Sequence, residues 1–260
     1  MLVGSAIAAS AVVLSVALPA NAVANGEPVP EGRYRFAVKL TMTDIPRPDG
    51  SHYNSACSGA LIAPRWIITA GHCFHDVNRN RVSGPVPYAT TATVGTADVT
   101  SGRGHTVNVV TVAQADGTDI AVAKLDRPIF DVAPIPLART GPAVGDVLRI
   151  TGFGATDSVD PMPSTILRTG QVQVSSVTGT TVGVHGYRPL PTTSACLYDS
   201  GAPYFRERPH RSPVLVSVEQ DGPDCPHDQE ETTSRVDTAA SLGSSGAVGT
   251  AASWIEGVIR

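Results

Sequence analysis

The chain has 260 residues, 42% of them apolar and 16% charged, which is enough to bury a sizeable core as one domain or two small ones. Its formal net charge is −4 and its lysines and arginines form no cluster, which argues against nucleic acid or an anionic lipid surface as a partner. The 25 glycines and 21 prolines, with many valines and threonines, predict short strands joined by turns, and therefore an all-β fold.

Residues 1–22 have the pattern of a secretory signal peptide. They carry no charged side chain, residues 2–18 are mostly apolar, and Ala20-Asn21-Ala22 is the small-x-small pattern of signal peptidase cleavage. The absence of lysine or arginine near Met1 departs from the usual start of such a signal. The apolar run is nearly long enough to span a bilayer, so a membrane anchor is the alternative.

The next part of the chain predicts strands that lead to a histidine. Residues 36–42 alternate between apolar and mostly small or polar side chains, which is typical of a half-buried strand. Residues 43–55 are rich in Pro, Asp, Gly, Ser and Asn and predict a loop. Two strands joined by a turn then lead into His72: residues 57–62 and 66–73. Further β-branched runs predict strands at residues 107–112 and 120–125.

A proline-rich stretch divides the chain into two halves. It is marked by residues 126–128 and 134–136. Strands are predicted to resume after it, at residues 147–151, 171–177, 181–184 and 214–218.

The carboxyl-terminal part predicts a surface insertion followed by a short helix. The string Thr-Ala-Ala-Ser occurs at residues 238–241 and again at 250–253, with Gly- and Ser-rich sequence between. Small flexible residues rarely pack a core, so residues 242–249 are expected on the surface. A helix over 254–260 would place four apolar side chains on one face: Trp254, Ile255, Val258 and Ile259.

Cysteine usage agrees with export. The four cysteines, Cys57, Cys73, Cys196 and Cys225, are expected to form two disulfides in an exported chain. Counting alone leaves three pairings open.

Three short strings supply the groups that amide hydrolysis requires. These are a nucleophile, a base that takes its proton, a group that orients the base, and donors for the oxyanion. Thr-Ala-Gly-His-Cys at 69–73 contains His72, Asp119 opens an apolar strand, and Asp-Ser-Gly-Ala-Pro at 199–203 contains Ser200. The order His, Asp, Ser along the chain matches one known arrangement of a catalytic triad.

Through these strings, the chain from residue 23 onward resembles the trypsin/chymotrypsin family of serine proteases. More narrowly, it resembles the secreted bacterial members of that family. The resemblance implies two antiparallel β-barrels with the active site between them and a short closing helix. Residues 23–128 would form the first barrel, with His72 and Asp119, and residues 129–260 the second, with Ser200. It also implies the disulfides Cys57–Cys73 and Cys196–Cys225.

The resemblance further implies a role for each site residue. His72 would be the general base and later the general acid, Asp119 would orient it, and Ser200 would be the nucleophile. The oxyanion hole would use the N–H groups of Tyr198 and Ser200, although the family usually has glycine at the position of Tyr198. Cleavage after Ala22 would free the ammonium of Val23 to pair with Asp199.

Four residues correspond to the family's substrate pocket: Ser194, Ser217, Glu219 and Glu231. Ser194 replaces the aspartate that lysine- and arginine-specific members carry, and Glu219 replaces a glycine at the pocket mouth. Two interpretations stay open for Glu219 and Glu231, namely recruitment of a basic substrate side chain and simple exposure to solvent. Ser217 is expected to hydrogen-bond Asp119.

The remaining motifs indicate no metal and no cofactor. The loop at 76–80 weakly resembles a calcium loop, but Arg81 stands where a sharp turn needs glycine. The other six histidines are expected on the surface or in loops: His52, His75, His105, His185, His210 and His227.

The function predicted from these observations is a secreted serine endopeptidase that acts on polypeptides. Protein protease inhibitors are expected as further partners, and no membrane partner is expected after signal cleavage. The alternatives are a protease-like binding module without catalysis and an esterase of the same fold.

Overall fold

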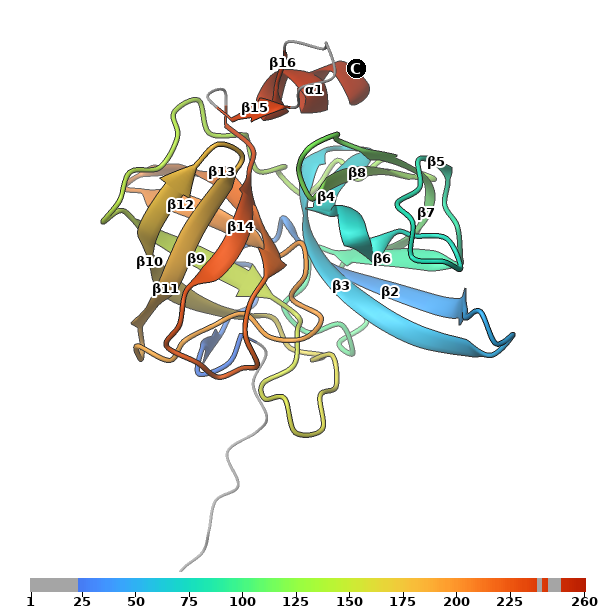
Figure 1. Cartoon of the computed structure of the whole chain (residues 1–260), viewed down its shortest axis with the longest axis horizontal. Coiled ribbons are helices and arrows are strands. Elements are labelled where there is room, and N and C mark those ends of the chain that lie inside the picture. The colour runs from blue at the N-terminus through green and yellow to red at the C-terminus, as the bar shows by residue number, and fades with distance from the viewer. Residues whose placement is uncertain (1–22, 238–239, 243–248) are drawn as a thin grey trace, which may run out of the picture.

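The computed structural model describes residues 23–237, 240–242 and 249–260. These residues form two antiparallel β-barrels that lie side by side, with one short helix at the carboxyl end (Figure 1). This is the fold class predicted from the sequence. The predicted signal peptide, residues 1–22, lies outside the described residues.

The first barrel is closed by six strands in the order β7-β6-β2-β3-β4-β8, with β7 paired back to β8. Its strands are β2 (Ala37–Pro46), β3 (His52–Ala63), β4 (Trp66–Ala70), β6 (Thr90–Val94), β7 (His105–Gln114) and β8 (Ile120–Leu125). The two-residue strand β5 (Gly84–Pro85) pairs with β7. Side chains of β6 alternate between buried and half-buried, so every second residue faces the core.

The second barrel is also closed by six strands, in the order β10-β11-β14-β13-β12-β9, with β9 paired back to β10. Its strands are β9 (Val147–Gly152), β10 (Arg168–Thr178), β11 (Thr181–Arg188), β12 (Pro203–Arg208), β13 (Arg211–Asp221) and β14 (Glu231–Arg235). The short strand β1 (Glu27–Pro28) pairs with β10, so the segment that begins at Val23 lies on this barrel.

The predicted carboxyl-terminal helix is present as α1 (Ala251–Val258), which begins three residues before the predicted 254–260, and it packs on the first barrel (Figure 1). Thr250 caps its amino end by accepting a hydrogen bond from Ser253 N. Ile255 is fully buried in the first core, and Trp254 packs against that core. Strands β15 (Ser241–Leu242) and β16 (Gly249–Thr250) pair just before the helix.

Two sequence expectations about loops need correction. Strand β2 continues to Pro46 and β3 begins at His52, so most of the predicted loop at 43–55 is a hairpin arm. Its polar side chains lie at exposed positions of a twisted, bulged strand pair, where they do not oppose strand formation. Leu242, predicted in the surface insertion, is buried against the first core because β15 and β16 turn it inward. The rest of that insertion, 243–248, lies outside the described residues.

Both disulfides join the pairs that the family resemblance implies. Cys57 is bonded to Cys73, and Cys196 to Cys225. The first ties β3 to the turn that carries His72, and the second ties the Ser200 loop to the segment before β14. Within the described ranges, no helix is long and apolar enough to cross a membrane.

Candidate active site

His72 and Asp119 meet because two neighbouring strands carry them to one end of the first barrel. His72 lies in the 3-10 turn η1 (Gly71–Cys73) that follows β4, and Asp119 immediately precedes β8. Strands β4 and β8 are antiparallel and pair with Ala70 opposite Ile120. This pairing brings the turn that follows β4 next to Asp119, which precedes β8. Asp119 Oδ2 lies 2.6 Å from His72 Nδ1, and Asp119 Oδ1 accepts a hydrogen bond from His72 N at 2.8 Å.

This contact fixes the chemistry of the imidazole. A carboxylate at Nδ1 holds the proton there and leaves Nε2 with a free lone pair. The Asp119 side chain is 15% exposed, whereas that of His72 is 47% exposed, so the imidazole reaches solvent and the carboxylate lies behind it. His72 is therefore oriented to accept a proton at Nε2.

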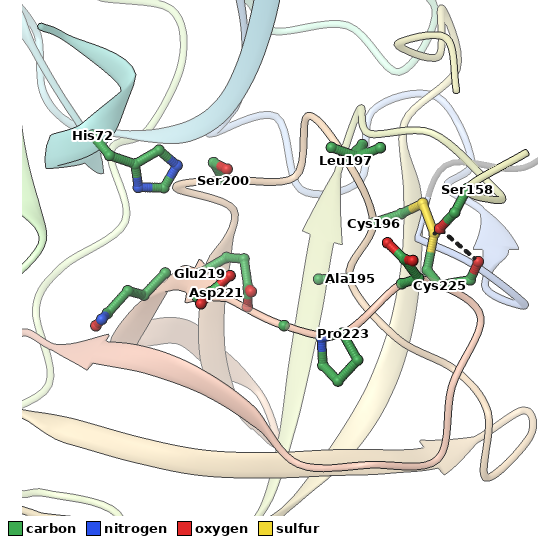
Figure 2. Close-up of a pocket in the computed structure, with 13 residues that line it drawn as sticks. His72, Ser158, Ala195, Cys196, Leu197, Ser200, Glu219, Asp221, Pro223 and Cys225 are labelled. Carbon is green, nitrogen blue, oxygen red and sulfur yellow. Dashed lines mark hydrogen bonds between the residues drawn. A yellow bond between two sulfur atoms is a disulfide. The ribbon is translucent and has the colours of Figure 1, made fainter. Parts of the chain in front are cut away.

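Ser200 lies opposite His72 at the junction of the two barrels. Both residues line the same cavity, in which they are neighbours (Figure 2). A backbone hydrogen bond ties the Ser200 loop to the first barrel, because Ser58 N of β3 donates to Ser200 O at 2.9 Å. Gly201 has a φ of +82°, and a Cβ there would lie 2.1 Å from Thr69 Oγ1 and 2.6 Å from Ala70 N. Only glycine allows the Ser200 loop to pack this closely on β4.

Tyr198, two residues before Ser200, adopts the left-handed backbone region with a φ of +74°. A residue with a Cβ is strained there, by about 1 to 2 kcal/mol relative to its relaxed conformation. The hydroxyl of Ser58 donates to Tyr198 O at 3.2 Å and accepts from Phe153 N at 3.0 Å. Sequence reasoning missed Ser58, because no local motif marks a contact between residues so far apart in the chain.

Asp199 is fully buried next to Ser200. Its carboxyl accepts hydrogen bonds from Gly154 N at 2.8 Å, from Cys196 N at 3.1 Å and from the N–H of Val23. Burial raises its pKa from 3.8 to about 7, because these N–H groups only partly replace the lost hydration. Val23 is itself fully buried. The structure thus brings the predicted activation pair, Val23 and Asp199, into contact.

The cavity that contains Ser200 has a volume of about 280 Å³ and extends along β13 toward Cys225 (Figure 2). Of the predicted pocket residues, Glu219 lines this cavity, whereas Ser194, Ser217 and Glu231 are buried outside its lining. The Ser217 hydroxyl accepts a hydrogen bond from Thr233 at 2.7 Å. The expected Ser217–Asp119 hydrogen bond is not found among the described residues, because Ser217 faces β14 instead.

The expected solvent exposure of Glu219 and Glu231 is also wrong, because both residues are buried. Glu219 is 4% exposed and Glu231 is 1% exposed. Their carboxyls meet at the hydroxyl of Tyr204, a residue that no sequence motif singled out.

Two of the remaining histidines, His75 and His227, lie in loops, as predicted, but are buried there. His75 and His227 are each 7% exposed. His75 packs against the ring of Tyr88, and His227 packs beside Glu231. In the described part of the chain, no three His, Cys, Asp or Glu side chains are grouped to hold a metal. Asp76 accepts hydrogen bonds from Asn78 and Asn80 of its own loop.

Comparisons with known proteins agree with this geometry. The family model described as Trypsin matches residues 23–238. A beta-fibrinogenase-like protein of Daboia siamensis is 28% identical over 58% of this chain and 64% of its own length. Brachyurin of Leptuca pugilator is 31% identical over 46% of this chain and 54% of its own length. Chymotrypsin-like elastase family member 3B of Macaca mulatta is 28% identical over 58% of this chain and 60% of its own length.

These three matches span less than two-thirds of each relative, and none of the three relatives is bacterial, so they do not support the predicted bacterial subgroup. The family model is more extensive, since it begins at Val23 and includes His72, Asp119 and Ser200. It covers both barrels and most of the chain. The chain belongs to the trypsin family of serine proteases.

Proposed function

We propose that the protein is a secreted serine endopeptidase in which Ser200, His72 and Asp119 form a catalytic triad. The observation that carries the proposal is the 2.6 Å contact between His72 Nδ1 and Asp119 Oδ2, with Ser200 opposite the same imidazole in one cavity (Figure 2). Its substrates are polypeptides, and protein protease inhibitors are its expected partners. Its assignment to bacterial members of the family stays a prediction.

The chemistry follows from the free lone pair on His72 Nε2. Ser200 Oγ attacks the scissile carbonyl carbon and gives its proton to Nε2, while Asp119 stabilises the resulting imidazolium. The N–H groups of Tyr198 and Ser200 stabilise the oxyanion. The leaving amine takes the proton from His72, and water, deprotonated by the same imidazole, then hydrolyses the acyl-enzyme. In support, neither N–H group is used in a hydrogen bond within the described residues.

Activation is part of the same proposal. A single cut after Ala22 during export exposes an ammonium at Val23, which pairs with the buried carboxylate of Asp199. The contact of the Val23 N–H with Asp199 supports this pairing. Amino-terminal sequencing of the secreted protein is expected to begin at Val23, and any other first residue contradicts the single cut.

Hydrolysis of a peptide library tests the proposal. The secreted protein is expected to cleave peptides, and Ser200→Ala and His72→Ala are expected to abolish turnover. Asp119→Asn is expected to lower kcat by about four orders of magnitude, because it stabilises the wrong imidazole tautomer.

A binding module without catalysis is the competing function, favoured by the strained Tyr198 at the expected oxyanion hole. It predicts that the protein retains peptides without cleaving them. Cleavage of esters without cleavage of peptides would instead indicate an esterase of the same fold.

A further inference from the structure

A group of three buried polar side chains lies directly behind the cavity. Tyr204 on β12, Glu219 on β13 and Glu231 on β14 come from three adjacent strands of the second barrel. The Tyr204 hydroxyl lies 2.7 Å from Glu219 Oε2 and 2.6 Å from Glu231 Oε2. Tyr204 is fully buried and both glutamates are at most 4% exposed, so no bulk water mediates these contacts.

The number of hydrogens in this group follows from its geometry. A tyrosine hydroxyl has one hydrogen and can donate it to only one of two carboxylates. The second oxygen–oxygen contact is a hydrogen bond only if that carboxyl carries a proton of its own and donates it to the hydroxyl. Two bare carboxylates at these distances in a dry interior would also repel each other strongly. One of the two glutamates is therefore protonated, and the pair carries one negative charge.

The surroundings assign the charge to Glu231. Ala195 N donates to Glu231 Oε1 at 2.6 Å, and His227 Nε2 lies 3.3 Å from the same oxygen. Apart from Tyr204, no described group donates a hydrogen bond to the carboxyl of Glu219. The other ionisable groups near Glu219 are Asp199 from the Ser200 loop and Asp221 from its own strand, and both are acidic. Burial and these neighbouring acids raise the pKa of Glu219 well above its usual range.

Only Glu219 of the pair lines the cavity that contains Ser200. Asp221 and Asp224 also line this cavity, and neither lysine nor arginine is among its lining residues (Figure 2). A cationic side chain entering from Ser200 toward Cys225 would therefore meet three acidic residues and no lysine or arginine, and Glu219 is the buried one of the three. A desolvated carboxylate attracts a cation far more strongly than an exposed one.

We infer that Glu219 selects a lysine or arginine side chain before the cleaved bond, and that it releases its proton to solvent as the cation enters. The inference rests on the proposed function. The free site holds a carboxylic acid, and the occupied site holds a carboxylate paired with the substrate's ammonium or guanidinium. One proton leaves for each cation bound, and the charge of the site is conserved. Glu231 keeps the hydrogen bond from Ala195 N throughout.

Proton release makes binding of a cation depend on pH. Below the pKa of Glu219, protons compete with the cation for the carboxyl group. The affinity of the site for the cation therefore increases by up to tenfold for each unit that the pH rises. A neutral side chain gains nothing from an ionised Glu219, and its binding is not expected to change in this way. Glu219→Gln keeps a similar shape and a group that can hydrogen-bond Tyr204, but it cannot release a proton.

Calorimetric binding of benzamidine, a small amidinium cation, tests the inference without requiring turnover. Titrations at pH 7 in buffers of different ionisation enthalpy count the protons released. The mature protein is expected to release close to one proton per benzamidine bound. Glu219→Gln is expected to bind at least tenfold more weakly and to release close to none. Asp221→Asn, a matched change at an exposed acid of the same cavity, is expected to alter affinity less than threefold.

Several results would overturn the inference: no binding, binding without proton release, or equal binding and release by Glu219→Gln and the unmodified protein. A larger effect of Asp221→Asn would also overturn it, because an exposed acid would then select the cation. Covalent labelling with a fluorophosphonate is measured on the same samples. Labelling with no cation site refutes the inference alone, whereas a cation site with no labelling refutes only the proposed function.

Discussion

Tyr198 shows how one residue can occupy a position whose backbone favours glycine. Its φ of +74° is retained although a Cβ is present, and the hydrogen bond from the Ser58 hydroxyl to Tyr198 O opposes rotation of that peptide. The strain is local and directed at the site, since the N–H of this residue is the proposed oxyanion donor. The tyrosine therefore costs stability without removing that donor.

Replacing Tyr198 separates the effect of the Cβ from that of the ring. Tyr198→Gly is expected to be more stable to denaturant than Tyr198→Ala by about 1 kcal/mol, because alanine retains the Cβ in a left-handed conformation. Both variants lose the ring, so their difference isolates the backbone. Equal unfolding midpoints for the two variants would show that this residue is not strained.

Gly201 sets the distance between the Ser200 loop and strand β4. Gly201→Ala is expected to reduce the rate of fluorophosphonate labelling at least a hundredfold, because its Cβ would lie 2.1 Å from Thr69 Oγ1 and displace the loop. Gly50 is a matched control with the same φ of +82°, and no atom lies within 4 Å of its Cβ position. Gly50→Ala is expected to lower stability by about 1 kcal/mol and leave labelling unchanged. Similar labelling by the two variants would contradict this role for Gly201.

At the scale of elements, helix α1 packs on the first core, and Ile255 is its largest buried side chain. Ile255 is fully buried in the first core, so Ile255→Ala is expected to lower the free energy of unfolding by about 2 to 5 kcal/mol. Gly257 lies in the same helix with no atom within 4 Å of its Cβ position, and Gly257→Ala is expected to raise stability by up to about 1 kcal/mol. Denaturant unfolding checks both values. A loss below 1 kcal/mol for Ile255→Ala would show that the helix contributes little to this core.

For the molecule as a whole, the amino terminus contributes to how stability depends on pH. When Val23 is still joined to Ala22, Asp199 has a pKa of about 7 in the folded state against 3.8 as its usual value. The folded state then holds a proton that the unfolded state has lost, so stability falls as pH rises from about 4 to 7. This rise in pKa corresponds to a loss of about 4 kcal/mol. A free ammonium at Val23 would stabilise the carboxylate and reduce that loss.

Two chains that differ only at the start test this dependence. A Ser200→Ala chain that retains Asn21 and Ala22 is expected to lose stability between pH 4 and 7, as measured by unfolding in denaturant. The same chain beginning at Val23 is expected to lose much less over that range. Parallel pH profiles for the two chains would contradict the ion pair between Val23 and Asp199.

Sequence reasoning reached the two barrels and brought together His72, Asp119 and Ser200, because each lies in a short string with a strong local pattern. It failed where a contact depends on packing between distant strands. Tyr204 joins Glu219 to Glu231 only after β12, β13 and β14 are adjacent. The hairpin at 43–55 was missed because its polar composition is typical of a loop. Paired strands at the edge of a barrel tolerate polar side chains at their exposed positions.

The central claim is that Ser200 is a nucleophile activated by His72, and mapping the site of a fluorophosphonate adduct by mass spectrometry tests it most directly. The native secreted protein is expected to carry one adduct on Ser200, with labelling abolished by Ser200→Ala, strongly slowed by His72→Ala and absent after denaturation. An unlabelled native protein, an adduct on another residue, or labelling that survives His72→Ala or denaturation would contradict the account.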